Sequence, residues 1–83
     1  MSFKIGDFVE LDELNSEIYC IVLSSYQALY SNDNSYEEMF TIQVIDCPNK
    51  NHKDEVYDAV YYNLSKVTDE KIINKLNKLI TFQ

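Results

Sequence analysis

The spacing of the apolar residues changes once along the chain, near residue 68, and this change constrains the fold more than any other feature. Before it, apolar and polar residues alternate in short segments, the period-two pattern of half-buried strands. Four segments carry this pattern or a continuous apolar run: residues 5–11, 17–24, 38–46 and 55–62. After it, apolar residues recur at helical spacing: Ile72, Ile73, Leu76, Leu79 and Ile80. The sequence therefore predicts a set of strands followed by one amphipathic helix.

Turn and cap residues separate these segments. The stretch SNDNS is the strongest turn signal, because Asn, Asp and Ser form turns through local side-chain hydrogen bonds. Residues 17–24 are β-branched and continuous, which favours a central strand covered on both faces, and the strand can continue into SYQALY. Thr68 is the predicted N-cap, with Asp69 and Glu70 in the first turn, where the helix dipole favours anions.

The composition supports one folded domain. Of the 83 residues, 46% are hydrophobic and 13% aromatic, which is too apolar for a disordered chain even at a net charge of −7. We expect a mainly β (α+β) fold over residues 1–83, with a four- to five-stranded antiparallel small barrel or sheet at 5–62 and the helix at 68–81. A core this small has little stability to spare, and we therefore also expect an obligate partner or a homodimer. The apolar helix stripe either caps an open end of the barrel, which we favour, or contacts a partner.

The charge is unevenly distributed along the chain. Residues 1–48 carry nine acidic residues against Lys4 alone, whereas residues 49–83 carry six lysines against five acidic residues. Nucleic-acid binding draws most of its affinity from cations that neutralise phosphates, so direct duplex binding is not expected. The same net charge would repel an anionic membrane. A protein partner with a basic surface fits better, because complementary fields speed encounter.

Residue types that carry chemistry are few. Cys20 and Cys47 are the only cysteines, and no signal-peptide pattern precedes the strands, so we expect reduced thiols and a cytoplasmic location. Cys47 and His52 have the residue types of a nucleophile and its base, but a cysteine that fills the end of a strand is the interpretation we prefer. A zinc site needs about four ligands, more than this chain offers in one place. We therefore expect no catalytic residue, no metal and no cofactor.

Two stretches resemble a known architecture. The first is KIGDFVEL, where Ile5, Gly6, Asp7, Val9 and Leu11 are similar to the first turn and strand of small barrels of the Src-homology-3-like type, including Tudor and KOW modules. The second is VYYNLSKV, which resembles the closing strand and following turn of short phage-encoded barrels through Tyr61, Asn63, Leu64 and Val67. The resemblance implies a small barrel, a phage origin and the cytoplasm of a host cell. At Gly6, independently of any resemblance, we expect a positive φ or a close backbone approach.

The functional hypothesis combines this resemblance with the charge and tyrosine content. The resemblance to phage-encoded barrels implies an inhibitor of a host nucleic-acid enzyme, since acidic phage proteins of this size often occupy the DNA-binding cleft. Carboxylates spaced along strands can stand in for phosphates. We expect a non-catalytic, DNA-mimicking protein-binding module whose partner-binding surface is built from Glu10, Asp12, Glu13, Glu17, Tyr30, Asp33, Tyr36, Glu37 and Glu38. One alternative is a small nucleic-acid-binding barrel that uses Lys50, Lys53, Lys71, Lys75 and Lys78 with stacked tyrosines. Another is a homo-oligomeric structural or virion component.

Overall fold

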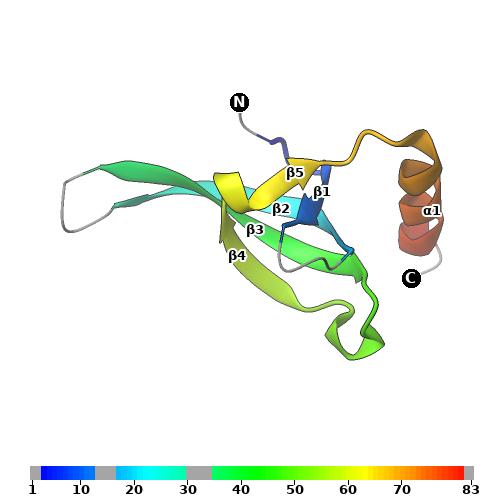
Figure 1. Ribbon diagram of the computed structural model, residues 1–83. Coiled ribbons are helices and arrows are strands. Elements are labelled where there is room, and N and C mark those ends of the chain that lie inside the picture. The colour runs from blue at the N-terminus through cyan, green and yellow to red at the C-terminus, as the bar shows by residue number, and fades with distance from the viewer. Residues whose placement is uncertain (1–2, 13–16, 30–34, 82–83) are drawn as a thin grey trace.

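The computed structural model describes residues 3–12, 17–29 and 35–81, and in them the chain forms one five-stranded antiparallel sheet and a C-terminal α-helix (Figure 1). The elements are β1 (Phe8–Leu11), β2 (Ile18–Leu29), β3 (Tyr36–Asp46), the 3₁₀ turn η1 (Lys50–His52), β4 (Val56–Val60), the 3₁₀ turn η2 (Tyr61–Asn63), β5 (Leu64–Lys66) and α1 (Glu70–Thr81). The mainly β fold with a terminal helix is confirmed. In this part of the chain no helix combines the length and apolar character needed to cross a membrane.

The strand boundaries differ from the expected ones in two instructive places. β1 begins only at Phe8, because Lys4 to Asp7 form a turn before it. β2 does continue through SYQAL to Leu29, as its sequence allowed. The stretch after residue 62 contains a further strand, β5, of three residues. It is too short to show an alternating pattern of its own, and its pairing with β1 makes it a strand.

The turn before β1 explains the position of the only glycine. Gly6 has a φ of +92°, which confirms the expected positive φ, and the Asp7 N–H donates to the Lys4 carbonyl at 3.0 Å. A positive φ at the third residue of a turn closed in this way is the type II geometry, which favours glycine. The Asp7 carboxylate also accepts the Lys4 N–H at 2.9 Å, and the Gly6 N–H donates to the Val22 carbonyl at 2.8 Å. The turn thus ties the start of β1 to β2.

The strand order is β4-β3-β2-β1-β5, so β4 and β5 are the two edges of the sheet within the described residues. In a flat sheet these edges would lie about 19 Å apart, at about 4.8 Å for each strand spacing. The chain passes from one edge to the other through η2 alone. A 3₁₀ turn rises about 2 Å for each residue, so the sheet must curl until its edges approach. No ladder joins β4 to β5 among the residues described, and the sheet is therefore curled but open.

The main core fills the concave face of this curled sheet. Its buried side chains come from all five strands and the segment after β3: Val9, Cys20, Val22, Phe40, Ile42, Val44, Cys47, Ala59 and Leu64. Phe3 packs its ring edge-on against Phe40, with 5.2 Å between ring centroids. Register shifts in the β2–β3 ladder between Tyr19 and Cys20 and between Val22 and Ser24 mark bulges, which help a sheet to curl.

The helix α1 packs against β3, at the end of the sheet away from the tip of the β2–β3 hairpin (Figure 1). Leu76 and Ile45 are buried, and neither belongs to the main core. The Lys75 ammonium lies 3.0 Å from the Asp46 carboxylate at the end of β3. The predicted N-cap at Thr68 is wrong by one residue: the Asp69 carboxylate accepts the Lys71 N–H at 2.9 Å, and the Asp69 carbonyl accepts the Ile73 N–H. Leu76 of the apolar stripe is therefore buried within the domain, whereas the expected capping of a barrel end stays a prediction because the sheet is open.

Candidate functional site

The β2–β3 hairpin projects beyond the rest of the sheet. β1 flanks β2 only as far as Ile21, and β4 flanks β3 only from Met39 onward. We call the remaining part the hairpin arm: residues 23–29 and 36–38. Figure 1 shows the hairpin arm extending on the side of the molecule away from α1. Strands without further neighbours gain little from the core, so the side chains of this arm are available for other contacts.

The hairpin arm exposes large apolar and aromatic side chains. Leu29 is 56% exposed, Tyr36 is 65% exposed, and Leu23 and Tyr26 are each about two-fifths exposed. Tyrosine is enriched at protein interfaces, because the ring supplies buried area while the hydroxyl tolerates water. An exposed group of this kind on an arm that the core does not need is typical of an interaction surface.

Two carboxylates accompany these rings. Glu37 lies opposite Ala28 and Glu38 lies opposite Gln27 in the β2–β3 ladder. The ion pairs found among the described residues all lie elsewhere, and none includes Glu37 or Glu38. One oxygen of Glu37, Oε2, is shielded from solvent without a hydrogen-bond partner in the described part of the chain. A desolvated carboxylate oxygen without a donor is costly, so a donor from a partner would be favourable here.

The other expected acidic residues lie at the opposite end of the sheet. Glu10 pairs with Tyr19, nine positions along β2 from Ala28, which corresponds to about 30 Å of strand. Asp12 accepts the Ser65 hydroxyl at 2.6 Å, and Glu17 is exposed just before β2. Burial, together with the charges of Glu10 and Glu17, raises the pKa of Tyr19.

The nine expected partner-binding residues therefore do not form one continuous patch in the described residues. Tyr36, Glu37 and Glu38 belong to the hairpin arm, whereas Glu10, Asp12 and Glu17 surround the start of β2. Three further members lie outside the described residues: Glu13, Tyr30 and Asp33. The sequence alone could not show that the length of β2 separates Glu10 from Glu37.

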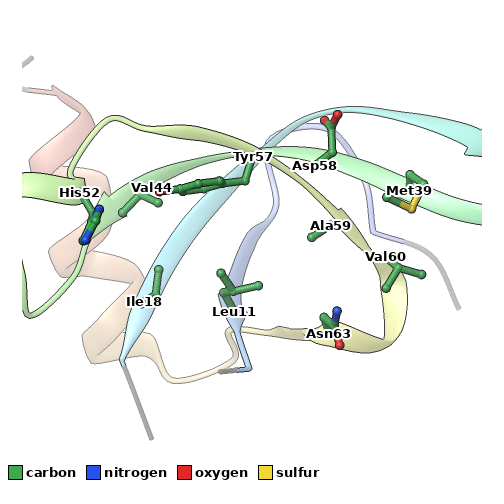
Figure 2. A pocket seen from close by; sticks show the side chains of 10 residues that line it. All are labelled: Leu11, Ile18, Met39, Val44, His52, Tyr57, Asp58, Ala59, Val60 and Asn63. Atoms are coloured by element: carbon green, nitrogen blue, oxygen red, sulfur yellow. The ribbon is translucent and has the colours of Figure 1, made fainter. Parts of the chain in front are cut away.

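An apolar cleft is the feature that sequence reasoning missed. It lies where the curled sheet stays open, has a volume of about 510 Å³, and is shown in Figure 2. Its lining comes from β1, β2, β3, β4, η1 and η2: Leu11, Ile18, Met39, Val44, His52, Tyr57, Asp58, Ala59, Val60 and Asn63. This volume is within the range of ligand pockets in proteins. Leu11, His52 and Asn63 stood out in the sequence for other reasons, and no local pattern indicated a concavity.

A small polar network borders the cleft. His52 Nδ1 lies 2.9 Å from one oxygen of Glu55, and the Tyr57 hydroxyl donates to the other oxygen. Cys47 does not join this network: it is buried in the main core, and its thiol donates to the Asn49 carbonyl at 2.8 Å. The preferred interpretation of Cys47, a side chain that fills the strand end, agrees with this position. Burial, and secondarily the nearby Cys47, raises the pKa of Cys20 to about 12, which keeps this thiol protonated near neutral pH.

The lysines of the alternative nucleic-acid site are partly engaged within the protein. The Asp46 carboxylate binds Lys50 at 2.6 Å and Lys75 at 3.0 Å. Burial alone would raise the pKa of Asp46, but hydrogen bonds from the two lysines outweigh it and hold that pKa below its usual value. Because two of the five lysines already neutralise a carboxylate, less positive charge remains for phosphates than the sequence suggests.

Among the residues described, no group of three or more His, Cys, Asp or Glu side chains is placed to hold a metal ion. The structure instead offers an acidic and aromatic hairpin arm at one end and an apolar cleft beside β4. No protein-family model, no curated protein and no solved structure matches this chain.

Proposed function

We propose that this chain is a non-catalytic protein-binding module whose hairpin arm engages a basic surface on another protein. The observation that carries the proposal is the combination on one projecting arm of exposed Leu29 and Tyr36 with Glu37 and Glu38, which have no ion pair among the described residues. Apolar area supplies affinity, and unpaired carboxylates supply orientation and a fast association rate.

The proposed partner surface is one that normally binds nucleic acid. Such surfaces present lysine and arginine side chains toward phosphates, and carboxylates can occupy the same positions. Lys4 is the only cation in residues 1–48, so the arm offers such a surface no repulsive charge. A phage-type inhibitor of a host nucleic-acid enzyme is the biological role we propose for this chemistry.

We also propose that the sheet is an opened relative of the small Src-homology-3-like barrels. The support is the direct passage through η2 from edge strand β4 to edge strand β5, together with the bulged, bent β2. Both features curl a five-stranded sheet toward closure.

Affinity capture followed by competition tests the proposed function. The wild-type chain, immobilised, should retain a nucleic-acid-binding protein from the native host in a salt-sensitive manner, and duplex DNA should compete for that protein. The E37Q/E38Q variant should bind the captured protein about tenfold more weakly, since each lost charge contact costs a substantial part of the interface energy. The E10Q/E17Q variant makes the same charge change at the other end of the sheet and serves as the matched control.

The proposal fails if the captured protein binds E37Q/E38Q as tightly as wild type, or if duplex DNA does not compete. Equal weakening by E10Q/E17Q and E37Q/E38Q would show that net charge matters and that the arm has no special role.

A further inference from the structure

The outer edge of β4 carries backbone groups that no strand of the described sheet uses. The Val44 N–H donates to the Glu55 carbonyl at 2.9 Å. In an antiparallel pair every second residue directs its backbone N–H and C=O groups toward the partner strand, so residues 57 and 59 direct theirs toward β3 as well. The N–H and C=O groups of Val56 and Asp58 therefore point away from β3. Since β4 is an edge of the sheet and both residues are exposed, these groups face solvent. Such a row is a template for pairing with another strand.

The apolar cleft lies directly beside this edge. Side chains alternate along β4, and Tyr57 and Ala59 line the cleft together with Val44, Leu11 and Ile18. Figure 2 shows Tyr57 directed along the cleft toward Val44 and His52, while β4 forms one border of the opening. A strand added to β4 would place alternate side chains over this cleft. The cleft is apolar, so those side chains would be apolar.

The other face of β4 specifies a different kind of side chain. The Asp58 carboxylate points away from the cleft in Figure 2 and accepts the Thr41 hydroxyl at 2.9 Å. Burial, and then a hydrogen bond with Asp58, raises the pKa of Tyr26. Both partners of Asp58 are neutral hydroxyls, and Asp58 belongs to none of the ion pairs among the described residues. Opposite charges that face each other across paired strands stabilise the pairing.

We propose that β4 binds an extended peptide segment of a partner protein by strand addition, and that this segment alternates apolar and basic residues. Backbone hydrogen bonds to Val56 and Asp58 supply general affinity, apolar side chains enter the cleft, and a lysine or arginine faces Asp58. This surface adjoins the hairpin arm through the hydrogen bond between Tyr26 and Asp58, but the proposal does not depend on the function proposed for the arm.

A second copy of this chain is the competing occupant, and the charges disfavour it. If two β4 strands paired antiparallel about Asp58, the Asp58 carboxylates of the two copies would lie directly opposite each other. If the pairing were shifted by one residue, the same two carboxylates would be diagonal neighbours on one face. Each copy also carries a net charge of −7, which opposes self-association. A basic segment removes both penalties.

The test uses a synthetic peptide of alternating valine and lysine, about seven residues long to match a typical strand. It is titrated into the isotope-labelled full chain while backbone amide signals are followed by NMR. We expect saturable shifts concentrated at Val56 and Asp58 and at cleft residues such as Tyr57. A peptide of the same composition with its lysines and valines in separate blocks is the control, and it should bind about tenfold more weakly because it cannot place both kinds of side chain at once.

Two further comparisons identify the mode of binding. N-methylation of the peptide on the edge that faces β4 should weaken binding about tenfold, while N-methylation on its other edge should not. The D58K variant should bind the valine–lysine peptide at least about fivefold more weakly and should gain binding to a valine–glutamate peptide. Circular dichroism should first show that the D58K chain is folded. The N-methylated peptides are tested on the wild-type chain, so their result does not depend on the folding of a variant.

Equal binding of the alternating and block peptides, with shifts at Glu37 and Glu38, would overturn strand addition and would instead support the hairpin arm as a basic-surface binder. Absence of shifts at low salt and high peptide concentration would also overturn it. Concentration-dependent dimerisation of the free chain through β4, detected by light scattering and the same amide shifts, would assign the edge to a second copy and refute the proposed peptide.

Discussion

Replacing Asp46 with Asn should loosen the attachment of α1 to the sheet. Asp46 ends β3, its side chain is only 13% exposed, and its carboxylate binds two lysines. Lys50 lies four residues away in the following turn, whereas Lys75 comes from α1. The D46N change keeps the shape of the side chain and removes the charge that joins sheet and helix.

The expected loss can be reasoned from the two contacts. Exposed ion pairs contribute about 0.2–1 kcal/mol, and both lysines are largely exposed. The carboxylate itself is mostly buried, which strengthens charge-assisted hydrogen bonds. We therefore expect D46N to lower the free energy of unfolding by about 1–2 kcal/mol at neutral pH. In a domain of this size each kcal/mol corresponds to a fall of about 4–8 °C in Tm.

The pH dependence of this loss has a definite sign. The pKa of Asp46 is lower in the folded chain than in the unfolded chain, because the hydrogen bonds of the two lysines outweigh its burial. The folded state therefore gains stability above the unfolded pKa, which is about 3.9 for aspartate, and loses it as pH falls through the lower folded pKa. The difference between wild type and D46N should be constant from about pH 5 to 8 and should shrink below about pH 4.

Urea denaturation across this pH range measures the difference, and hydrogen exchange locates it. K75Q should speed exchange in α1, whereas K50Q, which removes only the local pair, should leave α1 protected. Unchanged stability in D46N at neutral pH, or a difference that persists in full below about pH 3, would refute the reasoning. So would equal effects of K50Q and K75Q on exchange in the helix.

Three further substitutions or treatments test other parts of the fold. G6A should lower the free energy of unfolding by about 1–2 kcal/mol, because alanine is strained at the φ of +92° found at Gly6; no atom crowds the added Cβ, so backbone strain is the whole cost. G6N should cost less, because asparagine tolerates a positive φ, and equal costs of the two variants in urea denaturation would contradict this. L76A should cost about 2–5 kcal/mol in the same assay, because Leu76 is fully buried, and a loss below about 1 kcal/mol would show that α1 packs differently. Native Cys20, with its pKa near 12, should resist iodoacetamide at mildly alkaline pH until the chain unfolds, and mass spectrometry of the labelled chain would reveal early reaction.

The sequence predicted those features that depend on local pattern. Alternation located β3 and β4, helical spacing located α1, and Gly6 marked a positive φ. The N-cap was missed by one residue because Thr68 and Asp69 both have side chains that can cap a helix, and local pattern does not choose between them. β5 was missed as a separate strand because its three residues have no alternation of their own, and only their pairing with β1 makes them a strand.

The candidate site was less accessible to sequence reasoning, because it depends on how the sheet curls. Glu10 and Glu37 look alike in the sequence, yet the ladder places them at opposite ends of β2. The cleft requires Leu11 and Tyr57, distant in the chain, to line one opening. Its existence follows from the passage through η2, which brings the sheet edges near without pairing them. The periodicity of residues along the chain carries no information on such long-range contacts.

The two proposed surfaces differ in chemistry, and this gives them different roles. The hairpin arm carries Glu37 and Glu38 and no cation, whereas the edge of β4 presents backbone groups beside an apolar cleft. The charges of the arm would attract a basic partner during approach, so the arm would act at long range. The edge of β4 and its cleft would act only after contact, because backbone pairing and apolar burial are short-range interactions. A partner with both a basic surface and a neighbouring extended segment would engage the arm first and the edge second, and its affinity would exceed that of either contact alone because the second contact forms at high effective concentration.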